Sequence, residues 1–495
     1  MSTVNEQIDA LVGGNTVYQQ YVEQWRYLLV SYMGGDDYRE GGFLQKYQME
    51  TSAEYGSRLQ STPLDNHCGS VVRVYNSFLF RTEPARTFNQ LAGAPEVEDF
   101  LKDADMDGRS LDAFMSDVAT WSSVFGHCWI VMAKPAIGAL TRADEIAAGV
   151  RPYVNLLTPL AVLDWHWARR PSGRYELDYL RYVEDINGDI QIIKEWTPDE
   201  VRTIEVDTGQ ETIGEPLVEP NGLGRIPAVI AYNGRSMIRG VGISDIADIA
   251  DAQKFIYNLN SEIEQSVRLD SHPSLVTTPD TQIGTGAGAI IHMDGTLDPG
   301  LKPYLLEYSG ASVDSILATI DKTIASIEKM ANIGAVRATE SRTLSGVAME
   351  TEFQLLNARL AEKANALELA EEQLWRLWCA YQQVPYSVEI DYPGSFNIRD
   401  TGSELQQLKT ARETAQDPVI QQLIDRRLVE LLGEDPEEYF DTESYQMQTT
   451  SPGAERSAHI QEMIMSGYTD DEMRELHPEI SAGDIDSAKR ELLNV

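Results

Sequence analysis

The chain has 495 residues and a mass of 55.2 kDa, which is enough for about two to four hydrophobic cores and excludes a small disulfide-stapled scaffold. Hydrophobic residues make up 42% and charged residues 24% of the sequence, a balance that excludes disordered and collagen-like proteins. The net charge of −38 argues against a broad nucleic-acid-binding surface, because phosphates are neutralised by clustered basic groups. Any contact with DNA must therefore be local or weakly adhesive.

The three cysteines, Cys68, Cys128 and Cys379, are too far apart in the sequence to indicate a disulfide framework or a thiolate metal site. The N-terminus lacks a basic segment followed by an apolar one, and no run approaches the ~18 apolar residues of a membrane span. We therefore expect a chain that is made in a reducing cytoplasm and is neither exported nor embedded in a membrane.

The N-terminal part of the chain has a helical, aromatic-rich pattern. Apolar residues between Tyr18 and Leu29 recur at spacings of three and four, and Gly34-Gly35 breaks the pattern. A second helical stretch is predicted from about Ser52 to Leu79. Residues 96–135 then indicate a helix, an acidic turn, another helix and a strand that begins at Trp129.

Residues 153–231 change to short β-rich runs. The Asn187-Gly188 step between two of these runs is a strong hairpin signal.

Two long helices with apolar stripes are predicted on either side of a Gly-rich segment of about forty residues. The first runs from about Asp245 to Leu269, and the second covers residues 312–331. This arrangement predicts a hairpin-like stalk with a protrusion at its end. The stripes contain Ile249, Ile256, Leu259 and Ile263 in the first helix and Ile316, Ile320, Ile324 and Ile327 in the second.

Small and hydroxylated residues dominate the segment 333–345, which precedes the longest predicted helix. That helix begins near Val347 and continues past Trp378, so at 1.5 Å per residue it forms a rod on the order of 50 Å long. A strand is expected within residues 386–393. Residues 401–495 contain 21 Asp and Glu against 8 Lys and Arg, which predicts an acidic, helical C-terminal region.

No cofactor or metal site is predicted from the motifs. Asp103, Asp105 and Asp107 begin like a calcium-binding loop, but its twelfth position is Phe114 and its ninth is Leu111, so we favour a solvated turn. The run 284–289, GTGAGA, lacks the context of a dinucleotide-binding loop. No phosphate-binding GxxxxGK[ST] loop, HExxH or GxSxG motif is present, and the seven histidines show no ligand spacing.

One aromatic cluster has two interpretations. Trp165, His166 and Trp167, beside Arg169-Arg170, fit a stacking platform for bases. A strand edge or subunit contact is the simpler interpretation, and we favour it.

The order of these blocks resembles that of the portal proteins of tailed bacteriophages, the head-to-tail connector family. The resemblance is carried by order and spacing over roughly residues 20–385 rather than by one short motif. Its blocks are residues 32–84, 103–114 with 125–135, 242–276 and 342–375.

The resemblance implies an α+β, mainly helical, portal-type fold with wing, stem, clip, tunnel-loop and crown regions. The implied map is a wing over 1–244, with a helical and a β-rich part, and a first stem helix over 245–270. The clip is 271–309, the second stem helix 310–332, the tunnel loop 333–345, the long wing helix and strand 346–400, and the acidic crown 401–495.

The family also implies partners and site residues for this chain. The partners are a homo-oligomeric ring of about twelve subunits at one capsid vertex, double-stranded DNA in its channel, terminase, a head-tail adaptor and the major capsid protein, with no membrane. Arg337 and Arg342 would contact DNA from the tunnel loop, although the same segment also fits an inert linker between two helices. Gly284, Gly286 and Gly288 would shape the docking clip. The striped stem residues would pack between neighbouring subunits, because a lone stalk would leave them in water. No catalytic residue and no cofactor is expected.

Two other classes stay open at this point. A cytoplasmic helical scaffold protein would share the long helix without forming a closed ring. A carboxylate-based hydrolase would need two converging acids whose pKa values differ.

Overall fold

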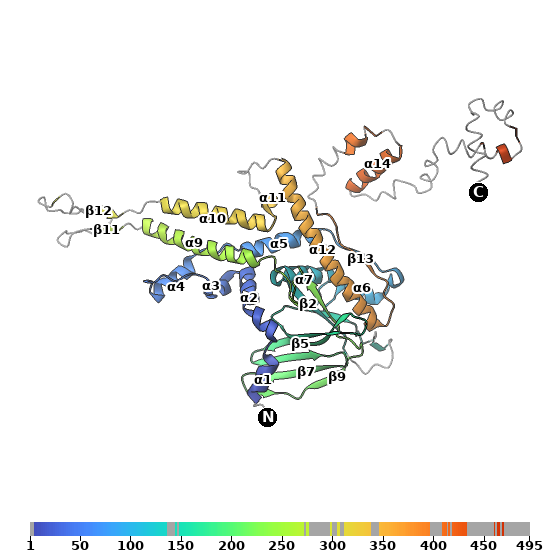
Figure 1. Ribbon diagram of the computed structural model, residues 1–495, viewed down its shortest axis with the longest axis horizontal. Coiled ribbons are helices and arrows are strands. Elements are labelled where there is room, and N and C mark those ends of the chain that lie inside the picture. The colour runs from blue at the N-terminus through green and yellow to red at the C-terminus, as the bar shows by residue number, and fades with distance from the viewer. Residues whose placement is uncertain are drawn as a thin grey trace. The chain divides into compact units, whose positions relative to one another are not determined.

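The computed structural model describes residues 4–135, 144–145, 148–271, 274–276, 298, 304–306, 311–337, 346–396, 408–412, 414–415, 418–432, 460, 463–465 and 468–469. The chain divides into two compact units, Met1–Asn397 and Ile398–Val495, which are treated separately below. The fold is mixed α+β, as the sequence predicts (Figure 1).

Five helices form the N-terminal part of the first unit. They are α1 (Val4–Val12), α2 (Thr16–Met33), α3 (Gly35–Glu40), α4 (Ser52–Ser61) and α5 (His67–Leu79). The sequence-based prediction of one helical stretch from Ser52 to Leu79 is wrong, because Pro63 forces Thr62 into an extended conformation that ends α4. The Asn66 side chain then caps the start of α5 by accepting from the Gly69 N–H.

A three-stranded antiparallel sheet lies at the centre of this unit, in the order β10-β2-β3. Its strands are β2 (His127–Ala133), β3 (Tyr153–Leu157) and β10 (Ala228–Tyr232), and α6 (Pro95–Lys102) and α7 (Leu111–Phe125) precede it in the chain. Gly126, at φ 88°, makes the turn from α7 into β2. A Cβ on Gly126 would lie 2.5 Å from the Gly242 carbonyl carbon, so this close crossing of two backbones requires glycine.

The β-rich region predicted for residues 153–231 is confirmed. Beyond β3 and before β10 it forms one antiparallel sheet in the order β4-β5-β6-β7-β8, with β9 also paired to β7. The predicted hairpin joins β5 and β6, and Asn187 pairs with Ile190 across it. The strands are β4 (Val162–Arg169), β5 (Tyr175–Asn187), β6 (Ile190–Trp196), β7 (Glu200–Asp207), β8 (Thr212–Ile213) and β9 (Leu217–Pro220).

The three long predicted helices are confirmed within a few residues. They are α9 (Ala247–Ser271), α10 (Ala311–Met330) and α12 (Gly346–Gln382). Strands β11 (Ser274–Val276) and β12 (Tyr304–Leu306), which lie in the chain between α9 and α10, pair with each other in antiparallel fashion. The short helix α11 (Gly334–Arg337) lies where only a loop was expected. The residue before it, Ile333, is fully buried in the core and holds the start of α11 against the first unit.

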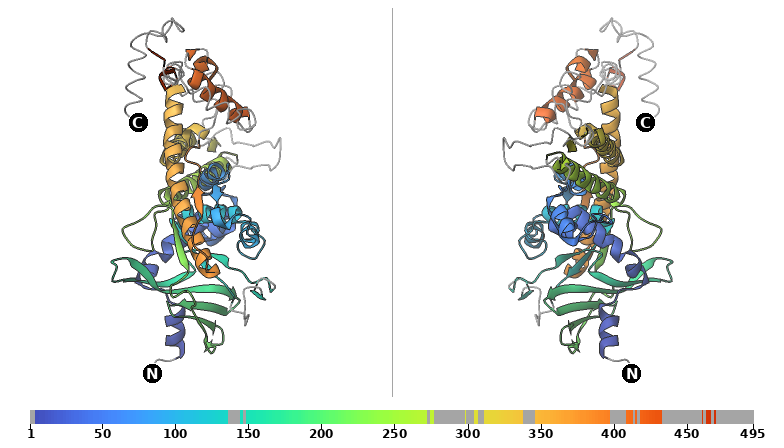
Figure 2. Two further views of the ribbon diagram at one scale, coloured as in Figure 1. Left: turned by 90° about the vertical axis from the view of Figure 1, so that its right-hand side faces the viewer. Right: turned by 90° about the vertical axis from the view of Figure 1, so that its left-hand side faces the viewer.

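One continuous core joins most of the first unit. Trp25, Trp129, Trp375 and Trp378 are its largest fully buried side chains, drawn from α2, β2 and α12. Strand β1 (Ala85–Thr87) pairs with β13 (Glu389–Asp391), which lies inside the strand expected over 386–393. Figure 2 shows α12 running along one side of this unit from α11 toward the sheets.

The second unit contains α14 (Pro418–Leu432), which agrees with the helical pattern predicted there. Arg412 forms an ion pair with Asp425 of α14.

Candidate functional site

The paired helices α9 and α10 are the candidate functional element. They lie side by side and extend away from the sheets of the first unit, as Figures 1 and 2 show from different sides. Ile256 is 1% exposed and Ile320 is 7% exposed, and Ile249 and Ile327 are also buried. All four belong to the chain's own core. The expectation that neighbouring subunits must bury these residues is therefore wrong, because the two stripes and the helices around them bury one another.

The other four striped residues, Leu259, Ile263, Ile316 and Ile324, are partly buried against the same core. The helices do present apolar side chains to the outside, at positions that the stripe analysis did not select. Phe255 is 48% exposed on α9, and Leu317 is 46% exposed on α10. These two side chains, together with Val267 of α9 and Met330 of α10 at 50% and 44% exposure, are available for contact with another molecule.

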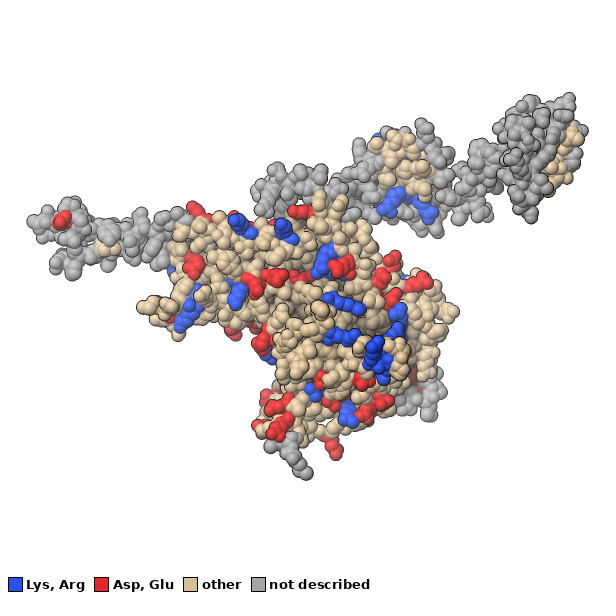
Figure 3. All heavy atoms as spheres, in the orientation of Figure 1, with Lys and Arg blue, Asp and Glu red and all other residues tan. Residues whose placement is uncertain are grey.

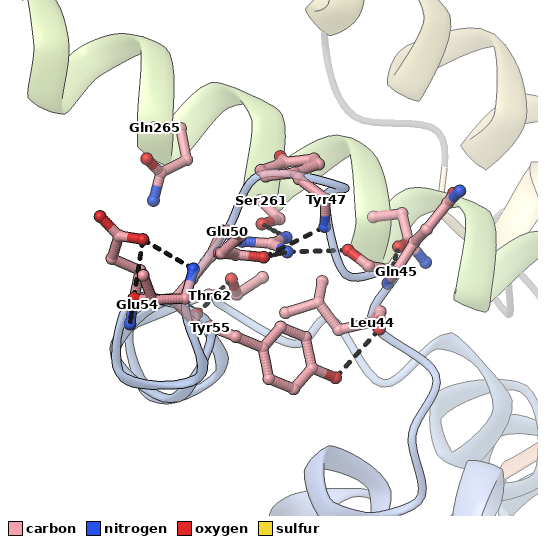
Figure 4. Close-up of polar contacts among 12 residues, drawn as sticks. Leu44, Gln45, Tyr47, Glu50, Glu54, Tyr55, Thr62, Ser261 and Gln265 are labelled. Atoms are coloured by element: carbon pink, nitrogen blue, oxygen red, sulfur yellow. Dashed lines mark hydrogen bonds and ion pairs between the residues drawn. The ribbon is translucent and has the colours of Figure 1, made fainter.

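A buried arginine anchors the middle of α9 to the N-terminal helices (Figure 4). Arg58, in α4, donates through Nε and Nη2 to the two carboxylate oxygens of Glu50 at 2.8 and 2.7 Å. Nη2 also donates to the Gln45 carbonyl at 2.7 Å, and Nη1 donates to the Ser261 hydroxyl of α9 at 2.8 Å. One guanidinium group therefore joins three segments of the chain. We call Arg58, Glu50, Gln45, Tyr47 and Ser261 the Arg58 anchor.

The electrostatics of this anchor favour its charged form. The hydrogen bond from Arg58 holds the pKa of Glu50 below its ordinary value, and the same bond raises the pKa of Arg58. The guanidinium carbon lies 4.0 Å from the centroid of the Tyr47 ring, a cation–π contact. Tyr47 donates its hydroxyl to Glu262 of α9 at 2.7 Å, and burial together with Glu262 raises the pKa of Tyr47 to about 12.

A second buried cluster fixes the segment that leads into α9. Asp245 accepts hydrogen bonds from Arg359 at 2.6 Å and from the Asn233 amide at 2.9 Å, and it pairs with Lys363. The Lys363 Nζ also donates to the Ser123 hydroxyl at 2.8 Å and to the Asn233 side-chain oxygen. We call these five residues the Lys363 anchor.

The Lys363 anchor holds an ion pair inside the protein. Burial alone would raise the pKa of Asp245, but Lys363, Arg359 and Asn233 together lower it. Burial lowers the pKa of Lys363 and Asp245 opposes this change. Because Nζ donates to three oxygen atoms, we assign it as an ammonium group. The start of α9 and the middle of α12 are thereby tied to each other.

The C-terminal half of α12 has an anchor of its own. Glu371, fully buried, accepts from Arg86 of β1 and from the Tyr392 hydroxyl at 2.6 Å. Trp375 donates its indole N–H to the same carboxylate at 3.2 Å. The helix predicted to be a strut is thus fixed at two points along its length.

Several predicted site residues are not placed by the structure. Gly284, Gly286 and Gly288 of the expected clip and Arg342 of the expected tunnel loop lie outside the described residues. Arg337 ends α11, so the first part of the expected loop is helical.

The acidic turn before α7 uses its carboxylates for ion pairs. Asp103 pairs with Arg151 and Asp105 with Arg109, and Asp105 also accepts from the Asp107 and Arg109 N–H groups. These contacts support the turn between two helices that the sequence predicts, but Asp105 is buried in it rather than solvated, because Arg109 and two backbone N–H groups satisfy its carboxylate. Among the described residues, no group of three or more His, Cys, Asp or Glu side chains is placed to hold a metal ion.

The Trp165 cluster is a strand edge, as favoured. β4 is the edge strand of its sheet, and Trp165 is buried with its ring 5.9 Å from that of Trp129. A buried ring cannot stack on a base, so the nucleic-acid platform is wrong for Trp165.

Sequence reasoning missed both anchors of α9. Their residues come from segments up to 240 positions apart, and a lone Arg or Lys in a helix pattern reads as a solvated residue. Only one local signal was available, the Thr51–Glu54 capping box that starts α4 and sets the direction of Arg58.

The three cysteines are buried thiols. Burial raises the pKa of all three cysteine thiols, to about 12 for Cys68 and about 11 for Cys379, so they are poor nucleophiles. No described helix is long and apolar enough to cross a membrane.

The fold is therefore a mixed α+β body from which a helical pair extends, with buried ion pairs at its base and along α12. Residues 170–417, just over half of the chain, match the family model for phage portal proteins of the SPP1 Gp6-like type. The chain belongs to this phage portal protein family.

No curated protein matches the chain. Similar solved structures include the virion of a native gene transfer agent particle (10% identity, 81% of this chain, 98% of that chain, TM-score 0.41). Others are the neck of an empty particle computed with C6 symmetry (10% identity, 75% and 91%, TM-score 0.42) and the neck of a native particle computed with C12 symmetry (12% identity, 75% and 91%, TM-score 0.40).

Proposed function

We propose that this portal protein forms a ring of about twelve subunits at one capsid vertex, with α9 and α10 as its stem. The observation that carries this proposal is that the family match includes the whole of α9, α10 and α12, while both stem helices expose apolar side chains. A ring requires heterologous contacts, in which one surface of a subunit meets a different surface of its neighbour. Phe255 on α9 and Leu317 on α10 offer two such surfaces on one chain.

The proposed channel passes double-stranded DNA during packaging and ejection. The net charge of −38 supports passage rather than adhesion, because an acidic wall repels phosphates and adds little friction. The ring would be assembled in the host cytoplasm and would contact the major capsid protein in the virion.

Substitutions at the adjacent residues Ile256, which is buried, and Phe255, which is exposed, separate the folding of the subunit from ring assembly. Ile256→Asp places a charge in the chain's own core and should lower the thermal stability of the subunit. Phe255→Asp combined with Leu317→Asp should leave the subunit folded and prevent ring closure, as seen by negative-stain imaging and mass measurement. Complete rings from the double variant would contradict the proposed stem contact.

We propose that residues 333–345, which include α11, reach the channel as a tunnel loop, with Arg337 and Arg342 contacting phosphates without reading bases. Replacing both arginines with Ala should keep ring formation and reduce the amount of genome retained after packaging, less so at high salt. Lys322→Ala, an exposed change on α10, is the control. Equal retention at low salt by the double variant and wild type would refute the DNA contact.

Residues 271–309 are proposed as the clip that docks terminase and the head-tail adaptor, with Gly284, Gly286 and Gly288 allowing its turns. Deleting residues 280–295 should abolish packaging while leaving the rest of the chain folded. Normal packaging by this deletion would refute the docking role.

A further inference from the structure

A basic groove lies between β10, the β4–β5 turn and α12 in this otherwise acidic chain. Its cavity measures about 700 Å³. Five exposed arginines line it, Arg174, Arg225, Arg235, Arg239 and Arg376, against a single carboxylate, Glu176. Figure 3 shows basic side chains gathered over the C-terminal end of α12 and the region beside it. Because the chain as a whole carries a net charge of −38, five arginines with one carboxylate in a single groove differ sharply from the average composition of its surface.

Most of the groove arginines are not neutralised by a carboxylate in the described part of the chain. Among the described residues, no carboxylate forms an ion pair with Arg174, Arg225, Arg235 or Arg239, and only Arg376 pairs, with Glu372 of its own helix. The one carboxylate of the lining, Glu176, is already bound by Arg170 at 2.9 Å. Arg225 donates to the Arg376 carbonyl at 3.4 Å, a neutral group that leaves its positive charge in place. An anion in the groove would therefore meet four guanidinium groups that no carboxylate described in the structure neutralises.

Three of the guanidinium groups are held in place by aromatic rings. The carbon of Arg239 lies 3.9 Å from the Tyr175 ring centroid and 5.5 Å from that of Trp167. Arg235 lies 5.3 Å from the Tyr232 ring, and Arg376 lies 5.0 Å from the Tyr386 ring. Stacking leaves the N–H groups at the guanidinium edge free to bind a carboxylate in two-point fashion, and it lowers the cost of ordering the side chain.

The groove is also apolar and elongated. Leu369 and Met237 are exposed at its lining, at 44% and 105%, between the arginines. A smaller cavity of about 270 Å³ shares five lining residues with it, including Tyr232 and Gln373, and extends it along α12 toward Glu362. Such a shape takes an extended segment of chain rather than the face of a folded domain.

We propose that this groove binds an extended acidic segment, with interspersed apolar side chains, of a separate partner protein. Carboxylates of the segment would pair with the arginines, and its apolar side chains would cover Met237 and Leu369. A duplex fits less well, because DNA offers phosphates but no apolar side chains to cover Met237 and Leu369. The proposal goes beyond the ring and does not depend on it.

The test uses the purified full-length chain in the assembly that it forms. The probe is a fluorescein-labelled peptide of three Glu-Asp-Phe-Glu repeats, compared with a Gln-Asn-Phe-Gln peptide of the same length and with a DNA duplex of equal charge. Binding is followed by fluorescence anisotropy at low and high salt. We expect the acidic peptide to bind at least about tenfold more tightly than the neutral peptide and the duplex, and more weakly as salt increases.

Two charge-matched double variants locate the binding. Arg225→Gln with Arg239→Gln should weaken binding of the acidic peptide about tenfold or more, whereas Arg26→Gln with Arg202→Gln, exposed arginines that lie outside the groove, should change it less than about twofold. Met237→Ser should weaken binding at high salt as well as at low salt, because its contribution is apolar.

Three results would overturn the proposal. Equal binding of the acidic and neutral peptides, or equal effects of the two double variants, would remove the role of the groove arginines. Tighter binding of the duplex through Arg225 and Arg239 would make the groove a nucleic-acid surface. A change of oligomeric state in the groove variant without peptide binding to wild type would make it a contact between subunits.

Discussion

The Arg58 anchor and the Lys363 anchor both hold α9 against the rest of the first unit, but they are built from different charged groups. The Arg58 anchor is built mainly from one short stretch, residues 45–58, and reaches α9 through Ser261 and through the Tyr47 hydroxyl, which donates to Glu262. The Lys363 anchor gathers its residues from four segments: α7, the end of β10, the segment before α9, and α12, which supplies both Arg359 and Lys363. Arg58 fills its donor sites with one bidentate carboxylate and two further oxygens, whereas two cations share Asp245. The loss of Lys363 should therefore disturb more of the fold than the loss of Arg58.

The largest effect is expected for Lys363→Met. This change leaves the 2%-exposed Asp245 carboxylate with one cation fewer and removes the donors to Ser123 and Asn233. Breaking a buried ion pair from one side costs about 3–5 kcal/mol. Urea unfolding should report this loss, and Lys322→Met on the exposed face of α10 should stay within about 0.5 kcal/mol of wild type. A small effect of Lys363→Met would mean that Arg359 alone neutralises Asp245.

A smaller effect is expected for Arg58→Met. Glu50, at 7% exposure, lies nearer to solvent than Asp245 and can regain water, so we expect a loss of about 2–3 kcal/mol. Arg58→Lys should recover less than half of this loss, because an ammonium cannot bind both Glu50 oxygens and the Gln45 carbonyl in the same geometry. Full recovery by lysine in urea unfolding would show that charge alone matters in this anchor.

Lowering the pH should reduce the contribution of both anchors to the free energy of unfolding. The folded-state pKa values of Asp245 and Glu50 are lower than those of the unfolded chain, so their contribution is complete above about pH 4–5 and is lost as the pH falls through the lowered values. Each such carboxyl changes the stability by at most about 1.4 kcal/mol per pH unit. Asp245→Asn, which removes one of these groups, should give a shallower fall of stability between about pH 4 and pH 2. An unchanged slope would mean that Asp245 titrates alike in both states.

Elements that depend on neighbouring residues could be predicted from the sequence, whereas clusters built from distant residues could not. The capping box at Thr51 and the apolar periodicity of α4 are local, so the helix that carries Arg58 was foreseen, apart from the break at Pro63. The partners of Lys363 have no local pattern, because Ser123, Asn233 and Asp245 lie in a helix end, a strand end and a loop. The same holds for the basic groove, whose arginines come from the β4–β5 turn, the segment around β10 and α12.

The sequence by itself determined the long helices, the β-rich region, the Asn187-Gly188 hairpin and the acidic character of the chain, because periodicity, turn chemistry and charge act over a few residues. Only the tertiary structure decided that Ile256 faces the chain's own core while Phe255, one residue away, faces outward. A helix pattern identifies an apolar stripe but not what covers it, since burial depends on which distant segments pack against that face. The anchors and the basic groove follow the same rule, because electrostatic partners are chosen by proximity in space and not along the chain.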